Sequence, residues 1–287
     1  GRRRGVGGEA GRSCRAVVRA AEVMGAYTVK VLGIAAGSSH TVIATAEGVC
    51  TFGGNSRGQL GHGNYRTVLR PKWAASMPVV AVAAGWLHTV MCTDVGQVFT
   101  CGLGGEGRLG HGARDQNEST PRLLEALVGR KAVTVAAGSR HTAVVTEGGE
   151  LLTFGSGECG QLGHGSRQDE LTPQLVEALV GKKVTAVAAG VKCTIVCTDA
   201  GEVYTFGVGH FGQLGHGTGQ DERTQRLVEA LVGKKVTDVA AGNMHTVVAT
   251  DAGEVLTFGG DHDGCLGHGG TGNELLPRAV DLEQEKR

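Results

Sequence analysis

Aromatic residues and prolines are scarce in this sequence, and neither sign of charge is in excess. Phe, Trp and Tyr make up 4% of the 287 residues, so Val, Ile, Leu and Ala must fill any core. Only five prolines accompany 50 glycines, which excludes a collagen-like chain. The 28 Lys and Arg balance 28 Asp and Glu, which argues against binding of nucleic acid or anionic membranes through overall charge. The abundant glycine, which tolerates positive φ, predicts many tight turns.

Long charge-free runs are also rare, and the longest does not predict a membrane span. Trp73–Thr93 has no Lys, Arg, Asp or Glu over 21 residues, which is long enough to cross a bilayer. It contains Pro78, however, and its second half fits the repeat described below. We therefore interpret it as strands and expect no membrane association.

The eight cysteines do not form a spaced disulfide framework. Cys50, Cys101 and Cys197 stand where other repeats carry apolar residues, which is typical of reduced, buried thiols. We therefore expect an intracellular protein of the cytoplasm, the nucleus or both.

Charge is uneven at the ends of the chain. Residues 1–19 hold six arginines and one acid, and we expect residues 1–28 to form a basic, disordered arm. Such an arm can contact the phosphates of DNA or chromatin, and the candidates for this are Arg2, Arg3, Arg4 and Arg12. A merely solvated end and an organelle transit peptide are the alternatives. Residues 283–287 form a charged C-terminal tail.

A repeat of about 52 residues organises the rest of the chain. The string Ala-Ala-Gly recurs at steps of 48, 53, 52 and 52 residues and ends at Gly37, Gly85, Gly138, Gly190 and Gly242. The string Leu-Gly-His-Gly keeps nearly the same period, with its histidine at His62, His111, His164, His216 and His268. A constant period of this length is typical of solenoids and propellers.

Each repeat contains four runs that we predict to be short β-strands. Examples of the first three are Val236–Ala241, His245–Thr250 and Glu254–Phe258, and Arg226–Leu231 represents the fourth. An Asp-x-Gly turn between the second and third runs favours a hairpin. Four strands in a unit of this length are typical of a propeller blade. The sequence thus predicts an all-β protein, a β-propeller of about five four-stranded blades over residues 29–282.

We expect this ring to be closed by its terminal strands. The last repeat ends on Leu276–Leu282, a strand of the fourth type, and the strand that should follow is present near the start as Val29–Ala36. Pairing of the two in one blade would remove two exposed sheet edges.

The repeated unit resembles that of a known family. The pattern GxxHTxxxTxxGxVxTFGxxxxGQLGHG, seen with small departures at 138–165 and 242–269, is similar to the repeat of the regulator of chromosome condensation family. The resemblance extends over residues 29–282 and implies a propeller. Family members usually carry seven repeats, whereas five are recognisable here.

The resemblance implies several functions, which differ in what they require. The family includes a nuclear exchange factor for a small GTPase, the plant ultraviolet-B photoreceptor and recognition domains of large ubiquitin ligases. The photoreceptor needs a tryptophan cluster, and this chain has only Trp73 and Trp86. The exchange factor inserts a β-wedge from one blade, and no repeat here is lengthened by an insertion. Some relatives attach to chromatin partly through a basic tail.

No pattern of residues predicts catalysis. All eleven histidines occupy repeat positions, so they lie around a ring and do not converge on one ion. The glycine-rich segments lack the P-loop pattern, and no Ser/His/Asp set or carboxylate pair stands apart from the repeat. We expect no enzymatic activity, no cofactor, no metal and no small-molecule substrate.

Side chains that vary between otherwise equal repeats are the candidates for binding, because propellers bind through their faces. The two residues after each Ala-Ala-Gly vary, and the candidates among them are Ser39, Trp86, Leu87, Arg140, Lys192 and Met244. A second variable set precedes Leu-Gly-His-Gly and contributes Arg57, Glu106, Glu158, Phe211, Asp261 and Asp263. Trp73 marks the first repeat, where 64–77 departs from the usual pattern. Burial in the core is the competing interpretation, above all for Trp86.

These observations favour a propeller that binds another protein, as a scaffold or as the recognition part of a ubiquitin ligase. A guanine-nucleotide exchange factor for a small GTPase is one alternative. A chromatin-associated propeller that uses the basic arm is the other.

Overall fold

The computed structural model describes residues 29–282, which fold into twenty strands. The arm at 1–28, with its four candidate arginines, and the tail at 283–287 lie outside the described residues. The strands of the first two blades are β1 (Val31–Ala36), β2 (His40–Thr45), β3 (Val49–Gly53), β4 (Val68–Ala75), β5 (Val79–Ala84), β6 (His88–Thr93), β7 (Val98–Gly102) and β8 (Glu118–Leu123).

The strands of the last three blades repeat this order. They are β9 (Ala132–Ala137), β10 (His141–Thr146), β11 (Leu151–Gly155), β12 (Glu170–Leu175), β13 (Val184–Ala189), β14 (Cys193–Thr198), β15 (Val203–Gly207), β16 (Glu222–Leu227), β17 (Val236–Ala241), β18 (His245–Thr250), β19 (Val255–Gly259) and β20 (Glu274–Ala279). Short 3₁₀ helices are η1 (Gly105–Gly107), η2 (Glu125–Leu127), η3 (Glu177–Leu179) and η4 (Glu229–Leu231).

Each sheet is an antiparallel meander of four consecutive strands, so one repeat makes one blade. The prediction of five four-stranded blades is confirmed. The fourth strand differs in position from its prediction at 226–231. It is β16, whose last residue Leu227 pairs with Tyr204, and the chain then turns through η4, which buries Leu231.

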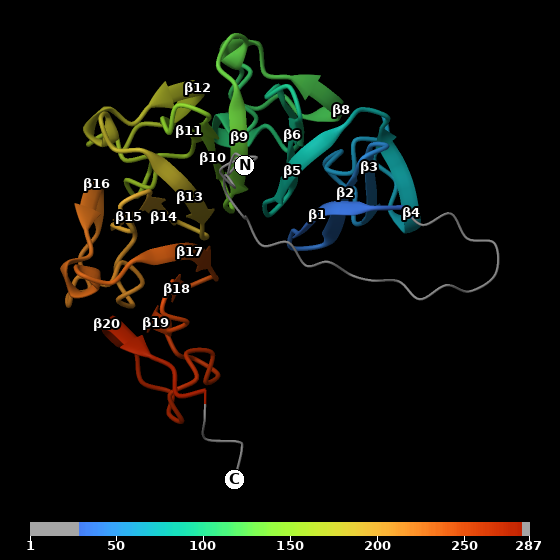
Figure 1. The fold of residues 1–287 in the computed structure, drawn as a ribbon. Coiled ribbons are helices and arrows are strands. Elements are labelled where there is room, and N and C mark those ends of the chain that lie inside the picture. Colours follow the sequence, from blue (N-terminus) through green and yellow to red (C-terminus); the bar gives the residue numbers. More distant parts are fainter. Residues whose placement is uncertain (1–28, 283–287) are drawn as a thin grey trace, which may run out of the picture.

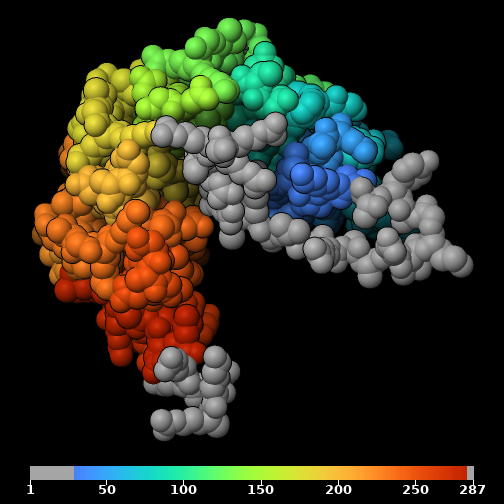
Figure 2. Space-filling view, in the orientation of Figure 1, coloured from blue at the N-terminus to red at the C-terminus, as the bar shows by residue number. Residues whose placement is uncertain are grey.

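The predicted pairing of the terminal strands is not found. β1 pairs with β2 and β20 pairs with β19, and no sheet of the described residues joins the first blade to the last. Every blade already draws all four strands from one repeat, so no strand is left to share. The blades form an open arc (Figure 1), and the space-filling view shows blades 1 and 5, blue and red, separated (Figure 2).

Four apolar cores hold the arc together, one between each pair of neighbouring blades. Between blades 4 and 5, for example, Ile195 and Leu214 of one blade pack with Val248 and Phe258 of the next, and all four are buried. Because apolar burial is shared in this way, a single blade has no complete core. The predicted use of Val, Leu, Ile and Ala as the main core residues is confirmed.

The second strand of each blade shows how neighbours cover it. β6, β10 and β14, in the three middle blades, are buried along their whole length. β18 of blade 5 alternates, and its half-buried residues begin with His245. In β2 of blade 1 the half-buried residues are Thr41 and Ile43. Each strand thus has one side toward the next blade and the other toward the preceding blade.

A hydrogen bond between histidine and threonine joins successive blades. The Nε2 atom of the histidine that opens the second strand lies 2.9–3.0 Å from the threonine Oγ1 of the following blade, in the pairs His40–Thr89, His88–Thr142 and His141–Thr194. Each threonine also bonds a main-chain oxygen, those of Gln59, Arg108 and Gln161, at 2.7–2.8 Å.

This geometry fixes the histidine tautomer. A hydroxyl has one proton, and the threonine donates it to the main-chain oxygen, so Nε2 must be protonated and donate to the threonine. The Nδ1 atoms of His40, His88 and His141 are then acceptors, and they are buried without a partner. Burial lowers the pKa of His40 and His141 to about 4, and the pKa of His88 falls well below its usual value for the same reason.

The boundary between blades 4 and 5 lacks this hydrogen bond. Cys193 takes the place of the histidine and is buried, while Thr246 of the next blade still donates to the Gln213 main-chain oxygen at 2.8 Å. The Oγ1 lone pair that accepts from histidine elsewhere has no histidine opposite it.

We expect Cys193→His to raise the free energy of unfolding by about 1 kcal/mol, the net value of one hydrogen bond. The imidazole would donate to Thr246, as it does at the three other boundaries. Urea unfolding of the purified protein measures the change. Cys193→Ala is the control without a donor, and equal or lower stability of the histidine variant would contradict the prediction.

A second histidine–threonine pair lies within each blade. The histidine of Leu-Gly-His-Gly approaches the threonine of the third strand at 2.9–3.0 Å, in the pairs Thr51–His62, Thr100–His111, Thr153–His164, Thr205–His216 and Thr257–His268. The glycine-rich loop is thereby attached to the sheet. Eight of the eleven histidines are therefore bonded to threonine in these two series, as their recurrence in the repeat suggests.

Candidate protein-binding face

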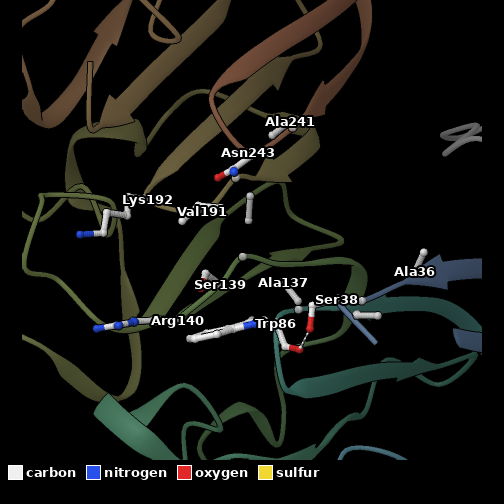
Figure 3. A pocket seen from close by; sticks show the side chains of 17 residues that line it. Ala36, Ser38, Trp86, Ala137, Ser139, Arg140, Val191, Lys192, Ala241 and Asn243 are labelled. Atoms are coloured by element: carbon white, nitrogen blue, oxygen red, sulfur yellow. Dashed lines mark hydrogen bonds between the residues drawn. The ribbon is translucent and has the colours of Figure 1, made fainter. Parts of the chain in front are cut away.

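A cavity of about 630 Å³ lies where the inner ends of the five blades converge. Its wall is built from the turn after each first strand, and Figure 3 shows Trp86, Arg140 and Lys192 around it. The residue directly after the glycine of Ala-Ala-Gly lines the cavity in every blade, in the set Ser38, Trp86, Ser139, Val191 and Asn243. We call this surface the central face.

The glycine of this turn is required for packing. A Cβ atom at Gly138 would lie 2.4 Å from the main-chain oxygen of Gly190 and equally close to the His141 ring. The main chains of neighbouring blades therefore approach closely at the cavity, and only the following residues vary freely. Ser38 also links blade 1 to blade 2, because its hydroxyl donates a hydrogen bond to the Trp86 main-chain oxygen at 2.7 Å (Figure 3).

The structure brings together three of the six residues predicted in this turn. Trp86, Arg140 and Lys192 line the cavity, and Trp86 is 46% exposed, so it is not a core residue. Ser39, Leu87 and Met244 do not line it. Their main-chain oxygens accept N–H groups from the glycine-rich loop of the same blade, at Gly54, Leu103 and Gly260.

Sequence reasoning missed the other four lining residues after the glycine. It gave equal weight to the two variable positions of the turn, but only the first lines the cavity in all five blades. The second reaches it where the side chain is long and cationic. The sequence holds no signal for this difference, because both positions vary between the blades.

Two acids of the second variable set hold the cations of the central face. Lys192 Nζ lies 2.8 Å from Glu158, and Arg140 lies 3.6 Å from Glu106. The hydrogen bond between Lys192 and Glu158 raises the pKa of the lysine and lowers the pKa of the carboxyl group. Both pairs are partly exposed, so they orient the side chains more than they stabilise the fold.

The other members of the second set differ in exposure. Arg57 and Asp263 are exposed, and Phe211 is half-buried with its ring 5.5 Å from that of His262. Asp261 is buried, and its carboxylate accepts the Leu266 main-chain N–H at 3.2 Å. Asp261 therefore shapes the loop from inside and is not accessible to a partner.

Arg108 supports the central face from below, and the sequence did not reveal this. It stands where sister repeats carry Gln59 and Gln161, it is buried, and it donates to the Ser139 main-chain oxygen across the blade boundary at 3.0 Å. It also pairs with Glu106, the one non-glycine residue with positive φ in the described part of the chain. Arg108 thus holds Glu106, and through it Arg140, beside Trp86.

The histidines and the remaining candidates do not extend this site. Trp73 lies on β4, the outer strand of blade 1, and is 44% exposed. In residues 29–282 no three His, Cys, Asp or Glu side chains are grouped to hold a metal ion, and no helix is long and apolar enough to span a membrane.

Comparison with known proteins places this architecture in a family. The model of the RCC1-like domain matches residues 49–287. The chain belongs to the RCC1-like domain family. This propeller is 36% identical to the human E3 ubiquitin-protein ligase HERC2 over 90% of its own length and 6% of that protein. It is also 36% identical to the ultraviolet-B receptor UVR8 of Arabidopsis thaliana, over 91% of its length and 60% of the receptor.

Solved structures give the same fold. Human WBSCR16 superposes with a TM-score of 0.78 and 28% identity, over 88% of this chain and 68% of its own. Prp20p of Saccharomyces cerevisiae, whose structure was described with its binding properties to Gsp1p and histones, gives 0.76 and 20% identity over 88% and 64%. The RCC1-like chain therefore spans less than two thirds of UVR8 and a small part of HERC2.

Proposed function

We propose that this RCC1-like propeller is a protein-recognition domain that binds its partner on the central face. The observation that carries the proposal is the half-exposed Trp86 beside Arg140 at the rim of a cavity to which every blade contributes. Trp and Arg are the residue types that most often dominate binding energy at protein interfaces.

The recurring and the variable residues of the repeat have different roles, and this difference supports the proposal. Recurring glycines, threonines and histidines bond the blades and loops together, so they are committed to the fold. The variable residues that line the cavity in every blade stand at a position that is free of that task, directly after Ala-Ala-Gly. Such a surface supports a binding role, because side chains that differ from blade to blade gather around one cavity.

The similarity to HERC2 suggests where such a domain acts. We propose a recognition role in a ubiquitin ligase or an associated scaffold, in the cytoplasm or nucleus. The seven cysteines of the described residues are free thiols, which suits a reducing compartment. The similarity to UVR8 does not extend to a tryptophan cluster, since Trp86 lines the cavity and Trp73 lies on an outer strand.

We expect Trp86→Ala and Arg140→Glu each to weaken partner binding at least about 10-fold, as for interface hot spots. Affinity purification identifies proteins captured by the wild type and lost by both variants, and calorimetry with the purified partner then measures the affinity. Lys183→Glu, an exposed change away from the central face, is the control. A partner that binds both face variants as tightly as the wild type would contradict the proposal.

Nucleotide release from small GTPases distinguishes the exchange-factor alternative. Prp20p shares the fold and is described as binding Gsp1p, so the assay is direct. Acceleration of release that is lost in Trp86→Ala would make the central face an exchange site.

A further inference from the structure

Three connections between blades present the same exposed residues on the side of the arc opposite the central face. Each joins the fourth strand of one blade to the first strand of the next, through η2, η3 or η4. Because a blade is an antiparallel meander, its connections and the turn between its second and third strands lie at one end of the strands, and the central face lies at the other. We call the surface formed by 124–131, 176–183 and 228–235, with the turns beside them, the connection face.

A groove lies between each connection and the neighbouring turn. The three grooves have volumes of about 330, 300 and 240 Å³. Buried Leu124 and Leu127 line the first groove, together with Val128, which is 62% exposed. Both flanking blades are present at this groove, since the Ala132 N–H donates to the Gly96 oxygen of the blade before it at 3.0 Å. The groove is therefore an open part of a complete blade boundary and does not depend on the ends of the chain.

The exposed valine recurs in all three connections without being buried by the fold. Val180 and Val232 line the other two grooves and are 62% and 63% exposed. Elsewhere the recurring residues of the repeat are buried or bonded, as His88 and Thr142 are. A valine that remains in water contributes little to folding, whereas a partner that covers it gains from its burial. Three such valines on one face indicate an interaction surface.

The charges of the connection face are unbalanced. Five of its six cations pair with acids of the turns, in Arg130–Glu150, Lys131–Glu147, Lys182–Glu202, Lys234–Glu254 and Lys235–Asp251. Over residues 29–282, no ion pair involves the five other acids of this face, which are Asp94, Glu125, Glu177, Asp199 and Glu229. All five are exposed, and Lys183 is the one cation of the face that is likewise unpaired. The connection face therefore carries an excess of free negative charge.

Each connection places a free carboxylate beside its exposed valine. The Val128 N–H donates to the Glu125 main-chain oxygen at 3.1 Å, and Val180 bonds Glu177 in the same way at 3.0 Å. Residues three apart in such a 3₁₀ turn lie above one another, so the two side chains share one side of the turn. The combination of groove, valine and carboxylate is repeated from blade to blade.

From these features we infer that the connection face docks a basic segment of a partner protein, with apolar residues between its cations. The apolar side chains would enter the grooves and cover Val128, Val180 and Val232, and the Lys or Arg side chains would meet the free carboxylates. Nucleic acid and anionic membranes do not fit, because the excess charge of the face repels them. The connection face and the central face lie at opposite ends of the strands, so this inference does not rest on the function proposed for the central face.

Valine methyl groups can show where such a segment binds. The probe is a synthetic peptide of repeated Arg-Leu-Lys, titrated into the full chain with labelled valine methyl groups and followed by NMR. We expect saturable shifts of the Val128, Val180 and Val232 signals. The signal of Val191 should not move, because that residue lines the central cavity.

The apolar contribution can be measured at constant charge. A peptide of repeated Arg-Gly-Lys has the charge of the first peptide but no side chain that fills a groove, so it should bind at least about 10-fold more weakly. Val128→Ser/Val180→Ser leaves the charge of the protein unchanged and should weaken binding of the Arg-Leu-Lys peptide at least about 5-fold.

Charge reversal measures the electrostatic contribution. Glu125→Lys/Glu177→Lys should weaken binding of the Arg-Leu-Lys peptide at least about 10-fold, and the melting temperature should not change because both side chains are exposed. Asp115→Lys/Asp263→Lys makes the same change in net charge at exposed acids of the glycine-rich loops, at the other end of the strands. This control should bind the peptide like the wild type.

Three results would overturn the inference. They are no saturable binding of the Arg-Leu-Lys peptide, shifts of Val191 in place of the three connection-face valines, and binding that neither the Val→Ser nor the Glu→Lys pair weakens in a folded protein. Shifts of Val191 would assign the peptide to the central face. Loss of partner binding in Trp86→Ala tests the central face alone, so failure of one proposal can be told from failure of the other.

Discussion

We expect the free energy of unfolding to fall steeply as the pH is lowered from 6.5 to about 4. His40 and His141 are buried as neutral rings, and their pKa is lowered to about 4 from an ordinary value of 6.5. His88, between them along the arc, is shifted in the same direction by burial, followed by the charge of Arg108. Protonation would place a proton on Nδ1, which has no acceptor.

The direction follows from where the protons bind. Above pH 6.5 the rings are neutral in both states, so their contribution to stability is complete. Below it the unfolded chain takes up protons that the folded protein does not, and stability is lost until the folded pKa is reached. The difference between the ordinary and the shifted pKa is worth about 3 kcal/mol for each of His40 and His141.

Urea unfolding at a series of pH values measures this dependence. The control is His141→Gln, whose amide can donate to Thr194 but does not titrate. Its stability should depend on pH less steeply, by about 1.4 kcal/mol per pH unit. A flat pH profile between 4.5 and 6.5 in the wild type would contradict the burial of neutral histidines.

His141→Ala should lower the free energy of unfolding by about 3 kcal/mol. The ring is fully buried between blades 3 and 4, so its removal leaves a cavity and also removes the donor to Thr194 Oγ1. Because the four cores are shared between neighbours, loosening this boundary weakens both halves of the arc. Thermal and urea unfolding measure the loss.

A double-mutant cycle with Thr194→Val separates the hydrogen bond from the packing. Thr194 also donates to the Gln161 main-chain oxygen at 2.7 Å, so its substitution alone is expected to cost about 1 kcal/mol or more. A coupling energy between the two substitutions identifies their bond. Additive effects, or a loss below about 1 kcal/mol for His141→Ala, would show that the pair does not join the blades.

The local elements of this propeller could be predicted from sequence because they depend on neighbours in the chain. Val236–Ala241 and His245–Thr250 were predicted as strands and are β17 and β18 without change. The fourth strand was predicted at 226–231, whereas β16 is Glu222–Leu227. Its end is set by the pairing of Leu227 with Tyr204 and not by the pattern of its own residues. Half of the candidates in the turn line the cavity, since variation marks the turn but not the direction of each side chain.

What the sequence by itself determined is the repeat, the four strands of each blade and the recurrence of histidine and threonine at fixed positions. Only the tertiary structure decided which of these residues meet. His88 bonds Thr142, 54 residues away, Arg108 reaches Ser139 in the next blade, and the terminal strands do not pair at all. The physical reason is that such contacts form between stacked blades, whose geometry is set by the packing of whole sheets and leaves no local periodicity in the chain.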